Sequence, residues 1–176
     1  MALYEFEGIA PTVGDSSFVH SHADVIGDVV IGENCWIGPG VRIRGDTEQI
    51  VIGDGTSIQD NCVIHTRDGM GLTVGSDVTV GHCAVLHSCT IEDKAIVGMG
   101  AIVTDGAVVG SGAIVAEGAV VKARLEVPAN SIVAGVPAKV VGEVKPHQRE
   151  NVLIGVTHYI DMCTRYKESM HRIDEG

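Results

Sequence analysis

Three histidines, His65, His82 and His87, lie close together in the stretch from residue 64 to residue 87. Neutral imidazole binds zinc and other transition metals, and a catalytic zinc has three protein ligands and a fourth position left for water. Zinc lowers the pKa of such a water to about 7 and thereby supplies hydroxide as a nucleophile at neutral pH. The three histidines are therefore candidate metal ligands, provided that the fold brings them together.

The elements that would position them follow a repeat of six residues. One aliphatic residue marks each repeat, and most steps between these markers are six residues long. The markers are Ile31, Ile37, Ile43, Ile52, Ile58, Ile64, Val74, Val80, Leu86, Ile91, Val97, Val103, Val109, Val115 and Val121. The longer steps after the third and the sixth marker predict loops at 45–50 and 66–71.

A period of six is not helical, and the abundance of valine, isoleucine and glycine favours short β-strands separated by turns. Aromatic residues make up 3% of the chain and hydrophobic residues 45%, which suits a narrow core of small aliphatic side chains. Three repeats, about 18 residues, close one triangular coil, and successive coils stack at ~4.8 Å. The sequence therefore predicts an all-β solenoid. General handedness rules alone would favour right-handed connections.

The repeat places two of the histidines in one column. His65 and His87 each follow a marker, and three steps separate those markers, so the two rings should lie one strand spacing apart, ~4.8 Å. Arg44 occupies the same column one coil earlier. His82 follows its marker by two residues and falls on the neighbouring face, near a corner. We therefore expect His82 to complete the site of an adjacent subunit in a threefold assembly.

The ends of the chain differ from its middle. Residues 1–24 are expected to be a lead-in, with the repeat beginning at residue 25, fading after Val121 and closing over 128–139. Apolar residues at mixed spacings of three and four predict a helix over 147–173. The predicted organisation is a β-helix over 1–145 and a C-terminal helical segment over 146–176 that packs on it.

Charge and composition exclude several classes of function. The formal net charge is −11, which argues against a nucleic-acid partner. No apolar stretch reaches the roughly 18 residues of a membrane span. The five cysteines form no CxxC pair, and the N-terminus does not resemble a signal peptide. These features predict a cytoplasmic protein in a reducing compartment.

Three segments resemble the γ-class carbonic anhydrase family: R-I-R-G-D (42–46), I-V-I-G-D-G-T-S-I-Q-D-N-C-V-I-H (50–65) and V-G-H-C-A-V-L-H-S-C-T-I (80–91). The tail G-V-T-H-Y-I-D-M-C-T-R-Y-K-E-S-M-H (155–171) resembles the phenylacetate-degradation and carnitine-metabolism subgroup of that family. The resemblance implies a left-handed parallel β-helix of hexapeptide repeats with a C-terminal α-helix. It also implies a homotrimer whose metal sites are shared between subunits.

The resemblance assigns roles to particular residues. It implies that His65, His82 and His87 bind Zn²⁺, with Fe²⁺ or Co²⁺ as alternative metals. Among the other candidate catalytic residues, Arg44 and Asp46 would pair near the subunit contact and Gln59 would border the metal-bound water. Tyr159 would reach the site from the helix. No further cofactor is implied.

Hydration of CO2 to bicarbonate by metal-bound hydroxide is the first expected function, which would make the protein a lyase. The loop after His65 carries no glutamate that could relay protons, which argues against a fast reaction. The first alternative is a metal-dependent acyl-CoA thioesterase, a hydrolase of phenylacetate catabolism. Two further alternatives remain open: an acyltransferase with a single histidine base and acetyl-CoA bound between subunits, and a trimeric scaffold without catalysis.

Overall fold

The computed structural model describes residues 2–173, which form a ladder of short strands and one long helix. The strands are Ala2–Tyr4 (β1), Thr12–Val13 (β2), Phe18–Val19 (β3), Asp24–Ile31 (β4), Trp36–Ile37 (β5), Arg42–Ile52 (β6), Ser57–Ile58 (β7), Val63–His65 (β8), Leu72–Val74 (β9), Thr79–Val80 (β10), Val85–His87 (β11), Thr90–Ile91 (β12), Ile96–Val97 (β13), Ile102–Val103 (β14), Val108–Val109 (β15), Ile114–Val115 (β16), Val120–Val121 (β17), Glu126–Val127 (β18), Ser131–Ala134 (β19) and Lys139–Glu143 (β20). The helix α1 spans Pro146–Ser169.

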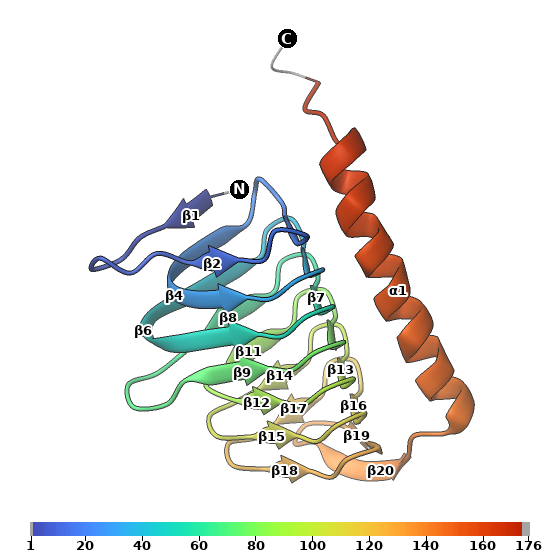
Figure 1. Ribbon diagram of the computed structural model, residues 1–176. Helices are drawn as coiled ribbons and strands as arrows, with labels where there is room; N and C mark the ends of the chain where they lie inside the picture. The colour runs from blue at the N-terminus through green and yellow to red at the C-terminus, as the bar shows by residue number, and fades with distance from the viewer. Residues whose placement is uncertain (1, 174–176) are drawn as a thin grey trace.

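The strands wind into a left-handed parallel β-helix, as the resemblance predicted. Neighbouring strands come from successive turns of the helix, for example in the order β17-β14-β11-β8-β6 along one sheet. Pairing is parallel between successive turns, while β19 and β20 pair antiparallel at the C-terminal end. Figure 1 shows the turns stacked like rungs, with α1 running along one side of the stack.

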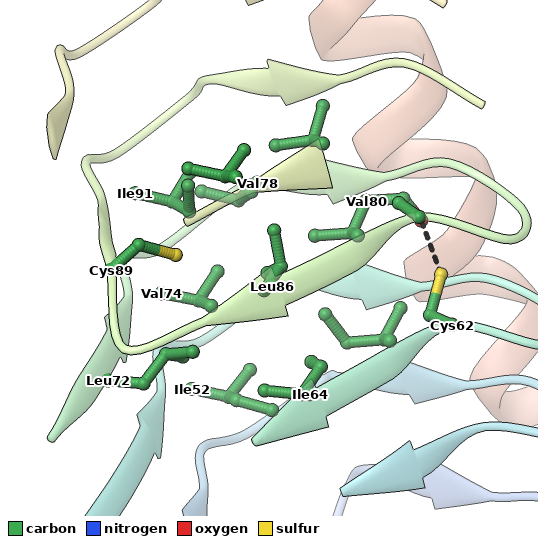
Figure 2. Packing of buried hydrophobic residues seen from close by; sticks show 14 of the residues in the cluster. Ile52, Cys62, Ile64, Leu72, Val74, Val78, Val80, Leu86, Cys89 and Ile91 are labelled. Atoms are coloured by element: carbon green, nitrogen blue, oxygen red, sulfur yellow. Dashed lines mark hydrogen bonds between the residues drawn. The ribbon is translucent and has the colours of Figure 1, made fainter. Parts of the chain in front are cut away.

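The register confirms that the six-residue markers form columns. Leu86 stands opposite Ile64 and also opposite Val103, and Ile64 stands opposite Ile43. All four side chains are fully buried in the core. Figure 2 shows Ile64 and Leu86 turned into the same interior as Val74 and Val80. Each turn thus adds one layer of small aliphatic side chains to a continuous narrow core.

The repeat extends further at both ends than the sequence prediction gave it. Val13 and Val19 pair with Ile31 and Ile37, so the coil begins before residue 25. At the other end Val127 pairs with Val109, and Val133 pairs with Val115, so the repeat does not fade after Val121. A buried valine at the marker position therefore extends the solenoid at both ends, although the residues of the adjoining turns differ from those in the middle of the chain.

The loop predicted at 45–50 is wrong, because this stretch lies inside strand β6. Strand β4 pairs with β6 on both sides of a register shift, and residues 46–49 stand opposite Asp28 alone. The extra residues therefore bulge out of a continuous strand. The loop predicted at 66–71 is confirmed between β8 and β9, where Arg67 and Met70 form an isolated antiparallel bridge and Gly69 has φ +72°.

Helix α1 is shorter than the predicted range of 147–173. It begins with Pro146 in the first turn, where the missing N–H is not needed, and the Gln148 side chain accepts a hydrogen bond from the Lys145 N–H at 2.9 Å. Residues 174–176 of the predicted helical segment lie outside the described residues. The division of the chain into 1–145 and 146–176 stays a prediction.

The helix packs on the outside of the solenoid through a small aromatic cluster. Phe18 and Trp36 lie on the solenoid, and both rings contact Tyr166 of α1, with centroids 5.2 and 5.9 Å apart. The Cys163 thiol donates to the Cys35 carbonyl oxygen at 3.2 Å. Within residues 2–173, no helix has both the length and the apolar character needed to cross a membrane.

Truncation of a column residue should destabilise the solenoid strongly. We expect Ile64→Ala to lower the free energy of unfolding by about 2–5 kcal/mol, because a fully buried side chain leaves a cavity between two turns. Ile154→Ala is the matched control, since that side chain is 67% exposed on α1. Urea denaturation of both variants measures the difference, and equal midpoints would contradict the column assignment.

Candidate functional site

His65 and His87 end two adjacent strands and face each other. His65 pairs in register with His87 on the next strand and with Arg44 on the preceding strand. The imidazole centroids are 5.3 Å apart, and Nδ1 of His65 lies 3.3 Å from Nε2 of His87. The column predicted from the six-residue repeat is therefore confirmed.

A carboxylate holds the outer nitrogen of each ring. Asp46 Oδ1 lies 3.2 Å from Nε2 of His65, and Asp105 Oδ1 lies 2.5 Å from Nδ1 of His87. An ionised carboxylate only accepts hydrogen bonds, so these outer nitrogens carry the protons of the neutral rings. With both rings neutral, the two nitrogens that face each other both present lone pairs.

This arrangement of donor atoms fits a metal ion. Two facing imidazole nitrogens 3.3 Å apart can share either a proton, as a hydrogen bond, or a metal ion. Tetrahedral zinc with Zn–N bonds of about 2.0–2.1 Å separates two ligand nitrogens by about 3.3–3.4 Å. The spacing of the two nitrogens therefore matches two positions of one zinc coordination sphere.

Electrostatics favour the neutral, ligating form of His65. Burial lowers its pKa below the ordinary value, and the charge of Arg44 acts in the same direction. The two carboxylates stay ionised. Hydrogen bonds from His87 and Arg67 hold the pKa of Asp105 below its usual range. Burial acts to raise the pKa of Asp46, but the hydrogen bonds from Arg44 and His65 outweigh it and leave the pKa lowered.

His82 lies in the turn after β10, on the other sheet of the solenoid, as the sequence predicted. Its Nδ1 is 2.9 Å from Asp60 Oδ2, and 43% of its side chain is exposed. His82 thus resembles the other two candidates, since one nitrogen faces a carboxylate and the other is free to bind. Pairing of a ligand histidine with a carboxylate is typical of metal sites.

One chain does not assemble all three histidines. Within residues 2–173, no group of three or more His, Cys, Asp or Glu side chains is placed to hold a metal ion. His65 and His87 supply two facing nitrogens, while His82 presents its own to the exterior. A site shared between subunits is compatible with this geometry and stays a prediction.

Arg44 and Gln59, two of the other candidate residues, contact groups next to these histidines. Arg44 binds Asp46 through two hydrogen bonds of 2.6 and 2.8 Å, so the expected pair exists within one chain. Gln59 is 7% exposed and directly precedes Asp60, the partner of His82. Its backbone N–H donates to the Val80 carbonyl oxygen at 2.9 Å, which ties it to the turn of His82.

Tyr159 lies apart from the His65–His87 column. Its ring contacts Trp36 at 5.0 Å between centroids, and burial raises the pKa of its hydroxyl. It lines a groove of about 510 Å³ between α1 and the solenoid, together with His20 and Asp60. Within the described residues, Tyr159 therefore lies on the same side of the solenoid as Asp60, and neither His65 nor His87 lines its groove.

Three further residues contact the candidate ligands or their carboxylate partners, and sequence reasoning gave none of them this role. Asp60 and Asp105 hold His82 and His87, and Arg67 pairs with Asp105 at 3.0 Å. Asp105 follows the marker Val103 by two residues, one turn after the marker of His87, so the repeat places it near His87 without specifying the contact. Asp60 stood within the I-Q-D-N-C-V-I-H segment without a role.

Comparison with known proteins shows close relatives of the whole chain. Residues 10–45 match the family model described as "Bacterial transferase hexapeptide (six repeats)". A Bacillus cereus protein named as an acetyltransferase, the product of the BC4754 gene, superposes with a TM-score of 0.93 at 35% identity, over 95% of this chain and 97% of the other. A hexapeptide transferase family protein from Anaplasma phagocytophilum superposes with a TM-score of 0.90 at 36% identity, over 94% and 98%.

A shorter match links the chain to the carnitine operon protein CaiE of Escherichia coli. The two sequences are 43% identical over 65 residues, which is 37% of this chain. The matched stretch spans 33% of the curated relative's own length.

Proposed function

This chain belongs to the hexapeptide transferase family, and we propose that within that family it is a metal-dependent enzyme of the γ-carbonic anhydrase type. The proposed reaction is hydration of CO2 to bicarbonate and a proton. The proposed metal is zinc, with iron or cobalt as alternatives, and the proposed assembly is a trimer with its sites between subunits.

One observation carries this proposal. Each of the three candidate ligands has one ring nitrogen against a carboxylate, in the pairs His65–Asp46, His82–Asp60 and His87–Asp105. A hydrogen-bond partner behind each ligating histidine is typical of metal sites, and here all three candidates have a carboxylate in that place. An enzyme that used one histidine as a base would need only one such pair.

Different residues would hold the metal ligands in place and orient the water. When bound, a divalent cation lowers the pKa of water and so supplies a nucleophile at neutral pH. Arg44 and His65 keep Asp46 ionised, which retains the proton on Nε2 of His65 and leaves Nδ1 to bind. Buried Gln59 is a neutral hydrogen-bonding group that can orient water without competing for the proton.

A thioester hydrolase is supported by the groove beside Asp60. Trp36, Tyr159 and Tyr166 give this groove of about 510 Å³ aromatic walls, which suit an aryl or acyl chain. The groove adjoins the carboxylate that holds His82, so a bound acyl group would lie close to the third proposed ligand. The same nucleophile could then attack a thioester carbonyl instead of CO2.

An acyltransferase is the competing proposal from a different class. The Bacillus relative is named as an acetyltransferase, and the family name is that of a transferase. The short His87–Asp105 contact of 2.5 Å also resembles a histidine base oriented by a carboxylate. That mechanism needs no metal, so the metal dependence of activity separates the two proposals.

An activity panel tests the proposed function. We expect protein loaded with zinc to hydrate CO2 in stopped-flow assays, to lose this activity when a chelator removes the metal and to regain it when zinc is returned. Acyl-CoA and aryl-CoA thioesters in the same panel test hydrolysis, and an amine or alcohol acceptor tests transfer. Transfer that persists without metal would overturn the proposal, and a metal-loaded trimer inactive on every substrate would favour the scaffold.

A further inference from the structure

Arg67 and Asp105 form a chain of contacts that ends on His87. The Arg67 guanidinium donates to Asp105 Oδ2 at 3.0 Å, while Asp105 Oδ1 accepts from Nδ1 of His87 at 2.5 Å. Each carboxylate oxygen thus serves a different partner. Arg67 lies in the loop that follows His65, and Asp105 lies one turn beyond His87, so the chain joins three levels of the solenoid.

The loop is anchored next to the same histidine. The Arg67 backbone N–H donates to Ser88 Oγ at 2.8 Å, and that hydroxyl donates to the Met70 carbonyl oxygen at 2.8 Å. Ser88 follows His87 directly and is 1% exposed. This buried hydroxyl fixes the start of the Arg67 side chain relative to His87.

We infer that Arg67 and Asp105 are positioning residues that lock His87 in the tautomer with its proton on Nδ1 and its lone pair on Nε2. This inference rests on the proposed function for its consequence, which is metal binding. Only the locked tautomer directs a lone pair from His87 toward Nδ1 of His65. The loop residue Arg67 therefore controls a ligand that it does not touch.

The lock makes an unusual prediction for Asp105→Asn. An asparagine side chain presents one oxygen and one NH2 group, and a guanidinium can only donate. Arg67 will therefore take the amide oxygen and leave the NH2 group facing Nδ1 of His87. His87 must then accept at Nδ1 and carry its proton on Nε2, where the metal would bind.

Metal affinity measures this effect without an activity assay. We expect Asp105→Asn to weaken zinc binding by about 10–100-fold in competition with a chromophoric chelator, as for other changes behind metal ligands. Asp93→Asn is the matched control, since Asp93 also follows its marker, Ile91, by two residues, and its side chain accepts a hydrogen bond from the Ser76 N–H. Equal losses in both variants would overturn the inference.

A double variant separates the lock from a simple loss of charge. In Asp105→Asn with Arg67→Ala, nothing prescribes the amide orientation, so its oxygen can turn to His87 and restore part of the affinity. We expect the double variant to bind zinc more tightly than Asp105→Asn alone. A double variant that binds as weakly as the single variant, or more weakly, would contradict the role of Arg67.

Metal-free protein distinguishes failure of the lock from failure of the proposed function. At about pH 8, where an ordinary histidine is neutral, ¹⁵N NMR should show His87 protonated on Nδ1 in the unsubstituted protein and on Nε2 in Asp105→Asn. Protonation on Nε2 in the unsubstituted protein would overturn the lock. Tautomers as expected in a protein that binds no zinc would refute the proposed function and leave the lock intact.

Discussion

His87→Ala is expected to abolish metal binding. Protein loaded with zinc and then freed of excess metal should contain one ion per subunit, and the variant should contain none above background. Loss of His87 removes one of two facing nitrogens that are 3.3 Å apart and also leaves Asp105 without its imidazole partner. Elemental analysis of the desalted protein measures the result.

His171→Ala is the control for this experiment. His171 is exposed and lies beyond the end of α1, so its removal should leave the zinc content unchanged. Thermal unfolding of both variants shows whether the solenoid is intact, since His87 does not belong to the buried aliphatic columns. A folded His87→Ala protein that still holds one zinc per subunit would refute the ligand assignment.

The six-residue repeat predicted the solenoid and the columns because the marker position of every repeat points into the core. Neighbouring turns stack in register, so position in the repeat translates directly into position in space. This is why the facing of His65 and His87 could be predicted without coordinates. The same rule located His82 on a different face.

The repeat did not predict the contacts made by side chains that leave the column. Asp105 and Arg67 belong to a turn and to an inserted loop, and neither the period nor the resemblance specifies where their long or short side chains reach. The course of residues 45–50 was missed for a related reason. A step of nine residues shows that chain has been inserted, but a loop and a bulge inside strand β6 have the same length.

The mixing of two inactive variants tests the central claim, that each metal site takes His65 and His87 from one subunit and His82 from another. His82→Ala and His87→Ala should each hold almost no zinc alone. After the two are unfolded and refolded together in equal amounts, random trimers should regain about a quarter of the unsubstituted zinc content. A regenerated site needs His65 and His87 from a His82→Ala subunit and His82 from a neighbouring His87→Ala subunit. Each of the two positions holds the required variant with a probability of about one half, which gives about one quarter.

Recovery of about a quarter of the zinc, measured on trimers isolated by size-exclusion chromatography, is the result that a shared site predicts. Trimers of either variant refolded alone provide the baseline. If the mixture holds no more zinc than that baseline, although the chromatographed trimers contain both variants, the site does not form between subunits and the functional proposal fails with it.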